Sequence, residues 1–100
     1  MPACAEVAEA FGRNLLFVRR RVGYSQEELA ALCSLNRTAI GLLENGRRVA
    51  RLDTIVKLGG GLGVDPCVLL DGIAWHVAGT RDGSFDVLLA PGERIKAVGR

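Results

Sequence analysis

Residues 25–48 read SQEELAALCSLNRTAIGLLENGRR, and this stretch decides the fold. Its opening places Ser25 three residues before Glu28, which is the spacing of a capping box. In that motif the serine side chain accepts a hydrogen bond from the glutamate amide, and the glutamate side chain reaches back to the serine amide. We therefore expect a helix to begin here, with Leu29 and Cys33 on its inward face.

A second short helix follows after a tight turn. Asn36 is a suitable N-cap for a helix over residues 37–45, and Gly46 is a suitable stop behind it. Residues 34–36 are left as the turn between the two helices. Such a pair is a candidate helix-turn-helix, although the same topology is common in all-α domains of other kinds.

Helices are also predicted on both sides of this pair. Apolar residues recur at spacings of three and four from Val7 to Val22, which indicates an amphipathic helix over residues 5–22. Leucine and isoleucine with similar spacing predict another helix over residues 52–62. Residues 59–61 of that helix are glycines, and each costs up to ~1 kcal/mol relative to alanine, so we expect fraying there.

The chain changes character after a short fifth helix. Asp65 and Pro66 are an N-cap and N1 pair for a helix over residues 66–70. Two stretches with a period of two then flank the turn-rich segment GTRDG and predict a β-hairpin. The alternating apolar positions are Ile73, Trp75, Val77, Phe85, Val87 and Leu89. We thus expect a mainly α domain over residues 1–71, and a hairpin extension with a loose tail over residues 72–100.

Length and composition exclude several classes of protein. With 100 residues, 49% of them hydrophobic and 24% charged, the chain has the size and composition of one globular domain. Its aromatic content of 5% is too low for a platform that stacks single-stranded nucleic acid. No apolar run approaches the roughly 18 residues of a membrane span, and the first residues lack the features of a signal peptide. We expect a cytoplasmic protein.

The sequence contains no catalytic or metal-binding constellation. Cys4, Cys33 and Cys67 are too far apart for a zinc site or a disulfide framework, so buried or semi-buried free thiols are the simpler interpretation. His76 is the only histidine, which rules out a histidine-based metal site or a catalytic triad within one chain. We expect no enzyme activity, no cofactor, no metal and no small-molecule ligand.

Positive charge is concentrated in the helical part. Residues 13–57 contain nine Lys and Arg against four Asp and Glu, whereas residues 59–100 contain four against five. A basic module of this kind suits an anionic partner such as nucleic acid. A solvated basic face would give the same balance.

Residues 25–48, followed by LDTIVKLGGGLGVDP at residues 52–66, resemble the Cro/repressor (XRE-like) helix-turn-helix family of bacterial and phage transcription regulators. The resemblance covers residues 11–70 and rests on the SQEELA opening, the LENG close and the LGVDP segment. It implies a repressor-like five-helix fold and sequence-specific binding of double-stranded DNA. The helix over residues 37–45 would read the major groove, and a homodimer would span two half-sites.

The resemblance also implies roles for individual residues. Arg19 and Glu44 match a structural salt bridge of the family, and Gln26 matches a glutamine that binds phosphate and braces the reading helix. Arg37 and Thr38 match residues at the end that enters the major groove, where arginine can bind guanine. The implied DNA contacts are Gln26, Asn36, Arg37, Thr38, Gly41, Leu42, Arg47, Arg48 and Arg51. Gly41 and Leu42 depart from the polar residues common at their positions, which leaves fewer base contacts.

A second hypothesis stays open, namely a protein-interaction module such as an antitoxin or adaptor with weak or secondary DNA binding. Leu16, Phe17 and Leu32 are apolar where relatives are usually polar, which suits a partner surface. The hairpin offers a further dimer or partner surface formed by Trp75, Val77, Phe85 and Val87. For the dimer we expect the hairpin, because an unpaired strand edge is a template for a second strand.

Two alternatives to the hairpin dimer remain at this point. The dimer could use the fifth-helix region near Val68 and Leu69. Trp75 and Phe85 could instead fold back on the first helix and leave a monomer.

Overall fold

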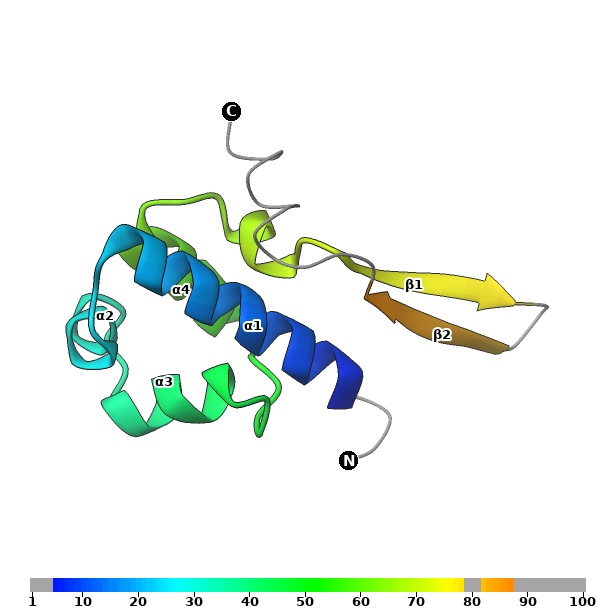
Figure 1. Cartoon of the computed structure of the whole chain (residues 1–100), viewed down its shortest axis with the longest axis horizontal. Helices are drawn as coiled ribbons and strands as arrows, with labels where there is room; N and C mark the ends of the chain where they lie inside the picture. Colours follow the sequence, from blue (N-terminus) through cyan, green and yellow to red (C-terminus); the bar gives the residue numbers. More distant parts are fainter. Residues whose placement is uncertain (1–4, 79–81, 88–100) are drawn as a thin grey trace.

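The computed structural model describes residues 5–78 and 82–87, and this part of the chain forms a helical module with a projecting hairpin (Figure 1). The helices are α1 (Ala5–Val22), α2 (Gln26–Leu32), α3 (Arg37–Glu44) and α4 (Leu52–Leu62), followed by the 3₁₀ helix η2 (Pro66–Leu70). The strands are β1 (Ile73–Ala78) and β2 (Asp82–Val87). The expected mainly α class is confirmed, and the expected fifth helix is a short 3₁₀ helix. We call α1 to η2 the helical module.

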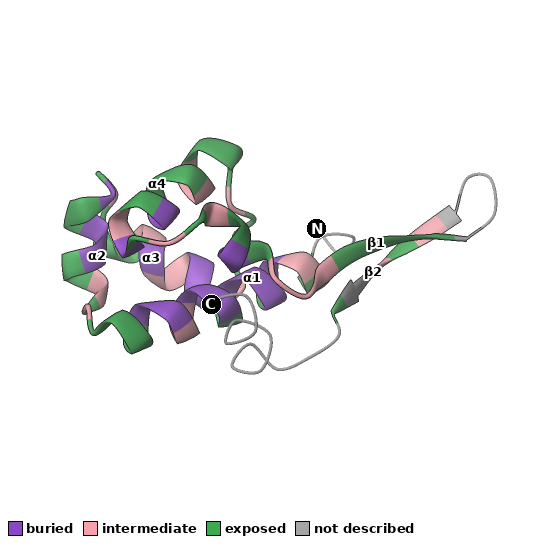
Figure 2. Ribbon diagram, turned by 90° about the horizontal axis from the view of Figure 1, so that it is seen from above, coloured by how far each residue is buried: buried purple, intermediate pink, exposed green. Residues whose placement is uncertain are grey.

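The helical module encloses one apolar core. Helix α1 packs against α3, α4 and η2, while α2 packs against α3 and α4. Buried residues lie on the sides of the helices that face one another, whereas the hairpin is largely exposed (Figure 2). The largest side chains with almost no exposure are Leu15, Leu29, Ile40, Leu43, Leu58 and Leu69.

The ends of α2 and α3 form as the sequence predicts. Ser25 Oγ accepts from the Glu28 amide at 3.0 Å, and Glu28 Oε1 accepts from the Ser25 amide at 2.8 Å. Asn36 Oδ1 accepts from the Ala39 amide at 2.8 Å at the start of α3. These bonds satisfy backbone donors that a helix start otherwise leaves without partners.

The glycines of α4 do not fray the helix, which corrects the expectation from propensity. The helix continues to Leu62 and ends where Gly63 adopts a left-handed φ of 75°. A Cβ at Gly59 would lie 2.7 Å from Pro66 Cγ, and one at Gly61 would lie 2.5 Å from Cys33 Sγ. These two glycines allow η2 and α2 to approach α4 closely, and that packing holds the helix.

Burial differs from expectation at three positions, namely Val22, Leu52 and Cys67, which are all exposed. Leu52 is 79% exposed and Val22 is 43% exposed, because each lies at a helix end beyond the reach of the core. Cys33 is a buried free thiol as expected, whereas Cys67 is exposed on η2. Cys4, Leu89 and the tail that follows it lie outside the described residues, as does the centre of the hairpin turn.

The module is fastened just before the hairpin begins. The Asn14 side chain on α1 is buried, and its Nδ2 donates to the carbonyls of Leu69 and Asp71 at 2.9 Å each.

Within the described residues no helix is long and apolar enough to cross a membrane.

The hairpin pairs β1 and β2 antiparallel and collects apolar residues on one face. Trp75 stands opposite Phe85, and Ile73 stands opposite Val87 two residues away along each strand. The Trp75 and Phe85 rings meet edge to face, with their centroids 5.0 Å apart. The two strands project beyond α1 (Figure 1). Trp75 is 56% exposed, so it does not fold back as a cap on the core.

Candidate nucleic-acid interface

The turn between α2 and α3 is a tight, hydrogen-bonded reversal. The amide of Cys33 donates to the carbonyls of Leu29 and Ala30, and the amide of Leu35 donates back to Ala30 at 2.9 Å. Ser34 adopts a φ of 56°, which is uncommon for a residue with a side chain. The left-handed residue lets the chain turn within a few residues, so α3 crosses α2 at a fixed angle.

Helix α3 lies directly against the backbone of α1. A Cβ at Gly12 would lie 2.5 Å from the carbonyl oxygen of Leu43 and 2.6 Å from that of Glu44. The α1–α3 contact therefore requires glycine at this position. Sequence reasoning did not assign Gly12 a role, although a lone glycine inside a helical pattern is the signal that points to such a contact.

A buried ion pair joins the two helices next to this contact. Arg19 Nε lies 2.5 Å from Glu44 Oε2, and Arg19 Nη2 donates to Glu44 Oε1 at 3.0 Å. The two side chains are only 11% and 3% exposed. The hydrogen bonds to Glu44 raise the pKa of Arg19 above its ordinary value, so the guanidinium stays charged. The salt bridge expected from the resemblance is present, with the two-pronged geometry that favours arginine.

Two further hydrogen bonds extend this pair to α2. Gln26 Nε2 donates to Glu44 Oε1 at 2.9 Å, and Arg19 Nη1 donates to the carbonyl of Tyr24 at 2.9 Å. The start of α2, the end of α1 and the end of α3 are thus linked through Glu44. Gln26 braces α3 in this way, while its second amide hydrogen and its oxygen have no bond to another described residue.

The start of α3 presents its side chains to solvent. Asn36, Arg37 and Thr38 are all exposed. Within residues 5–78 and 82–87, neither Arg37 nor Thr38 makes a side-chain hydrogen bond or ion pair. Asn36 uses its oxygen as the helix cap, which leaves its amide hydrogens available. The arrangement offers a cation and two hydrogen-bonding groups at one end of one helix.

The next turn of α3 is less polar. Gly41 and Leu42 are partly exposed, and a Cβ at Gly41 would lie 4.0 Å from Gln26 Nε2. Gly41 therefore lies beside Gln26, and a small side chain would also fit there. Leu42 offers only apolar contact.

The arginines after α3 fall into two groups. Arg47 and Arg48 are exposed, and their side chains form no ion pair within the described part of the chain. Arg51 is also exposed, but its Nε lies 3.3 Å from Asp53 Oδ1 and it gives α4 no side-chain cap. Its charge is thus partly offset.

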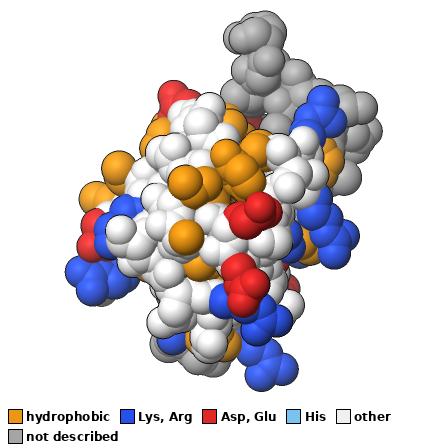
Figure 3. Space-filling model, turned by 90° about the vertical axis from the view of Figure 1, so that its left-hand side faces the viewer, with side chains coloured by type: hydrophobic (Ala, Val, Ile, Leu, Met, Phe, Trp, Pro, Cys, Tyr) orange, Lys and Arg blue, Asp and Glu red, His pale blue; other side chains and the backbone are white. Residues whose placement is uncertain are grey.

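The end of the molecule formed by α2 carries basic, acidic and apolar side chains on one face (Figure 3).

Helix, turn and helix in this arrangement, with an exposed basic helix start, define the class of protein. The helix-turn-helix family profile matches residues 15–69, and the chain belongs to this family. It is a DNA-binding regulator of transcription of the XRE type, and the family is not one of enzymes.

Individual relatives agree with this assignment. The chain is 44% identical over 62 residues to the control protein C.BamHI of Bacillus amyloliquefaciens. The aligned region covers 61% of this chain and 76% of that protein. It is 29% identical over 96 residues to a hypothetical transcription factor of Neisseria meningitidis serogroup B, covering 96% of this chain and 74% of that one.

Solved structures show the same fold. The restriction-modification controller protein C.AhdI of Aeromonas hydrophila superposes with a TM-score of 0.64 and 36% identity over 66% of this chain and 96% of that one. The Neisseria transcription factor superposes with a TM-score of 0.65 and 31% identity over 91% of this chain and 84% of that one. C.AhdI thus matches a part about the length of the helical module, whereas the Neisseria match extends beyond it.

Proposed function

We propose that this chain regulates transcription as a homodimer that inserts α3 of each copy into the major groove of double-stranded DNA. The observation that carries the proposal is the start of α3, where Arg37 and Thr38 are exposed and free while the other end is held by Glu44. Arg37 donates to O6 and N7 of a guanine, and Thr38 contacts a neighbouring base edge or phosphate.

Other residues bind the DNA backbone in this proposal. Arg47 and Arg48 neutralise phosphates beside the groove, and Gln26 contributes the amide hydrogen that Glu44 does not use. Asn36 and Leu42 make short-range contacts, and Gly41 allows close approach. Arg51 contributes less, because Asp53 competes for its charge. Each phosphate neutralised makes binding more sensitive to salt.

Dimerisation assigns different tasks to the two parts of the chain. We assign DNA binding to residues 1–71 and dimerisation to the hairpin extension over residues 72–100, through the face with Trp75, Val77, Phe85 and Val87. The burial of Val68 and Leu69 supports this choice over the η2 region, since both side chains are occupied in the core of their own chain. A dimer places two reading helices on half-sites about one helical turn apart.

An interaction module with secondary DNA binding is the second candidate function. The observation in its favour is exposed apolar surface, with Leu32 at 55% and Trp75 at 56% exposure. The interaction module accounts less well for the unpaired arginines on α3 and in the loop that follows α3. Leu32 lies on α2, apart from the α1 residues Leu16 and Phe17, so the three do not line one groove.

The main test is selection from random oligonucleotides with the purified protein at two salt concentrations. We expect enrichment of a palindromic site and a steep fall of affinity with salt. Enrichment of no site would favour the interaction module instead.

The variant Arg37→Ala tests the reading role. Loss of a two-pronged guanine contact should weaken binding to the selected site by about 1–3 kcal/mol and relax one base position in each half-site. Arg51→Ala is the matched control and should cost less, evenly across sequences. Equal losses of affinity by Arg37→Ala on selected and random DNA would reduce Arg37 to a phosphate contact.

A further inference from the structure

Leu42 is an apolar residue of α3 that does not belong to the core. Ile40 and Leu43 of the same helix are 0% and 2% exposed, whereas Leu42 is partly exposed. Within the described residues, the partly buried apolar side chains that pack against the core include Leu35 and Ala50 but not Leu42. Packing against the core therefore does not account for a leucine at this position.

The helical repeat places Leu42 on the outward side of α3. Each residue turns the helix by about 100°, so Leu42, two residues after Ile40, lies about 160° from it around the helix axis. Thr38, four residues before Leu42, is exposed and lies within about 40° of it. Thr38 and Leu42 thus form one strip along the outward side of α3, and both of their side chains carry methyl groups.

The neighbouring strip of α3, which contains Arg37 and Gly41, is open beside Leu42. In the described part of the chain, the nearest atom of another element to a Cβ at Gly41 would be Gln26 Nε2, at 4.0 Å. Because Gly41 has no side chain to hold α3 away, a base edge can approach the helix backbone at this turn. A short side chain such as that of Leu42 needs this close approach to reach a base.

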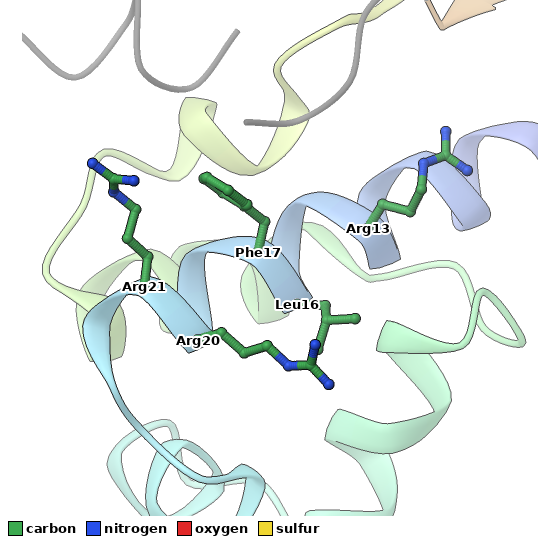
Figure 4. A pocket seen from close by; sticks show the side chains of 5 residues that line it. All are labelled: Arg13, Leu16, Phe17, Arg20 and Arg21. Carbon is green, nitrogen blue, oxygen red and sulfur yellow. The ribbon is translucent and has the colours of Figure 1, made fainter. Parts of the chain in front are cut away.

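Apolar residues on α1 lie in different surroundings. A pocket of about 460 Å³ on that helix is lined by Arg13, Leu16, Phe17, Arg20 and Arg21 (Figure 4). Its arginines extend around the two apolar side chains, and Leu42 does not line it. Leu42 is therefore not part of the α1 surface, and it lies on the helix to which we assign the reading of DNA.

The major groove of DNA offers one kind of apolar group to such a side chain. Base edges present hydrogen-bond donors and acceptors there, and thymine also presents its C5-methyl group. Leucine neither donates nor accepts hydrogen bonds, so only the methyl group complements it. 5-Methylcytosine carries the same group at the same ring position. The chemistry that suits Leu42 is thus a pyrimidine methylated at C5.

We propose that Leu42 contacts the C5-methyl group of a pyrimidine, so that this chain distinguishes methylated from unmethylated C5 at one position of each half-site. The inference rests on the proposed DNA binding and names the group that the outward strip of α3 recognises. Thymine supplies the methyl group in ordinary DNA, and 5-methylcytosine supplies it where cytosine is methylated. Arg37 reads guanine by hydrogen bonds, so the two strips of α3 recognise different chemistry.

Removal of single methyl groups tests the contact. In the site obtained by oligonucleotide selection, each thymine is replaced in turn by uracil, which keeps the base pair and lacks the methyl group. We expect one replacement in each half-site to weaken binding about fourfold, the effect of returning one methyl group to water. The variant Leu42→Ala should bind the thymine and uracil forms of that position equally.

Methylated cytosine separates the methyl group from the rest of thymine. A C·G pair is placed at the sensitive position, with its cytosine either unmodified or methylated at C5. Methylation should strengthen binding of the unaltered protein about fourfold and should leave binding of Leu42→Ala unchanged. A response to uracil without a response to methylated cytosine would limit the contact to thymine and overturn the recognition of methylated cytosine.

Leu32→Ala is the matched control for Leu42→Ala. Leu32 is a leucine at the end of α2, 55% exposed and outside the proposed reading surface. Leu32→Ala should therefore keep the preference for thymine over uracil, and circular dichroism checks that both variants keep their helices. If no uracil replacement weakens binding, or if Leu42→Ala keeps the preference for thymine, the methyl contact is wrong.

The outcome is separable from that of the proposed function. If selection enriches a palindrome that Arg37→Ala relaxes while no uracil replacement changes affinity, the methyl contact is wrong and DNA binding stands. If selection enriches no site, the reading of DNA and the methyl contact are both wrong.

Discussion

The helical module and the hairpin contain apolar residues of the same kind, and they use them in opposite ways. In the module Leu15, Leu29 and Leu58 are 0% exposed, whereas in the hairpin Trp75 and Val77 are more than half exposed. Helices packed on several sides can enclose a core, but two strands form only one layer, and beyond Ile73, which packs against the core, Trp75 and Val77 stay exposed. The contrast indicates a module that is complete in itself and a hairpin that needs another surface.

The largest effect on the module should come from its buried ion pair. Glu44→Ala leaves Arg19 charged and buried without its partner and removes the acceptor of Gln26. We expect the free energy of unfolding to fall by about 3–5 kcal/mol, measured by urea denaturation.

The exposed pair Arg51–Asp53 is the matched control for that experiment. Its side chains are 83% and 59% exposed, so Asp53→Ala should cost under ~1 kcal/mol. Similar losses from the two variants, or an unchanged melting temperature for Glu44→Ala, would contradict the structural role of the buried pair.

A smaller loss should follow from crowding the α1–α3 contact. Gly12→Ala places a methyl group against the carbonyls of Leu43 and Glu44, and overpacking of this kind costs about 1–3 kcal/mol. Gly60→Ala is the control, because a Cβ at this position would have no described atom of another element within 4 Å and alanine favours helix by up to ~1 kcal/mol relative to glycine. The melting temperature should therefore fall for Gly12→Ala and rise for Gly60→Ala. A shift in the same direction for both variants would contradict the close approach of α1 and α3.

The smallest effect on stability should come from removing the hairpin. Truncation after Asp71 keeps the carbonyl that Asn14 binds and removes Ile73, which is only partly buried, so the module should lose about 1 kcal/mol. The same truncation should convert the proposed dimer into a monomer that binds half-sites weakly. A fragment that stays dimeric at micromolar concentration would place the interface on the helices.

Local chemistry made much of the module predictable. The cap at Ser25, the cap at Asn36 and the stop at Gly46 depend on neighbouring residues alone, and α2 and α3 formed where these signals placed them. The pairing of Arg19 with Glu44 came from the family resemblance, since the two lie 25 positions apart and no local rule connects them.

The remaining features depend on contacts between distant segments. Propensity counts Gly59 and Gly61 as weak points, and only the positions of Pro66 and Cys33 reveal why a side chain would not fit. Periodicity gave the hairpin its apolar face, but no pattern within one chain says what covers that face. The sequence predicted one apolar partner surface at Leu16, Phe17 and Leu32, but Leu16 and Phe17 lie on α1 beside three arginines, whereas Leu32 lies on α2.

The glycines of α4 have a consequence for the order of folding. Three of the eleven residues of this helix are glycine, so its last turns have little tendency to form before their neighbours are in place. We expect the segment to be unstructured in the transition state, with φ-values near zero around Leu62. Substitutions there should speed unfolding and leave the folding rate almost unchanged. Helix α4 would thus be the last part of the module to close.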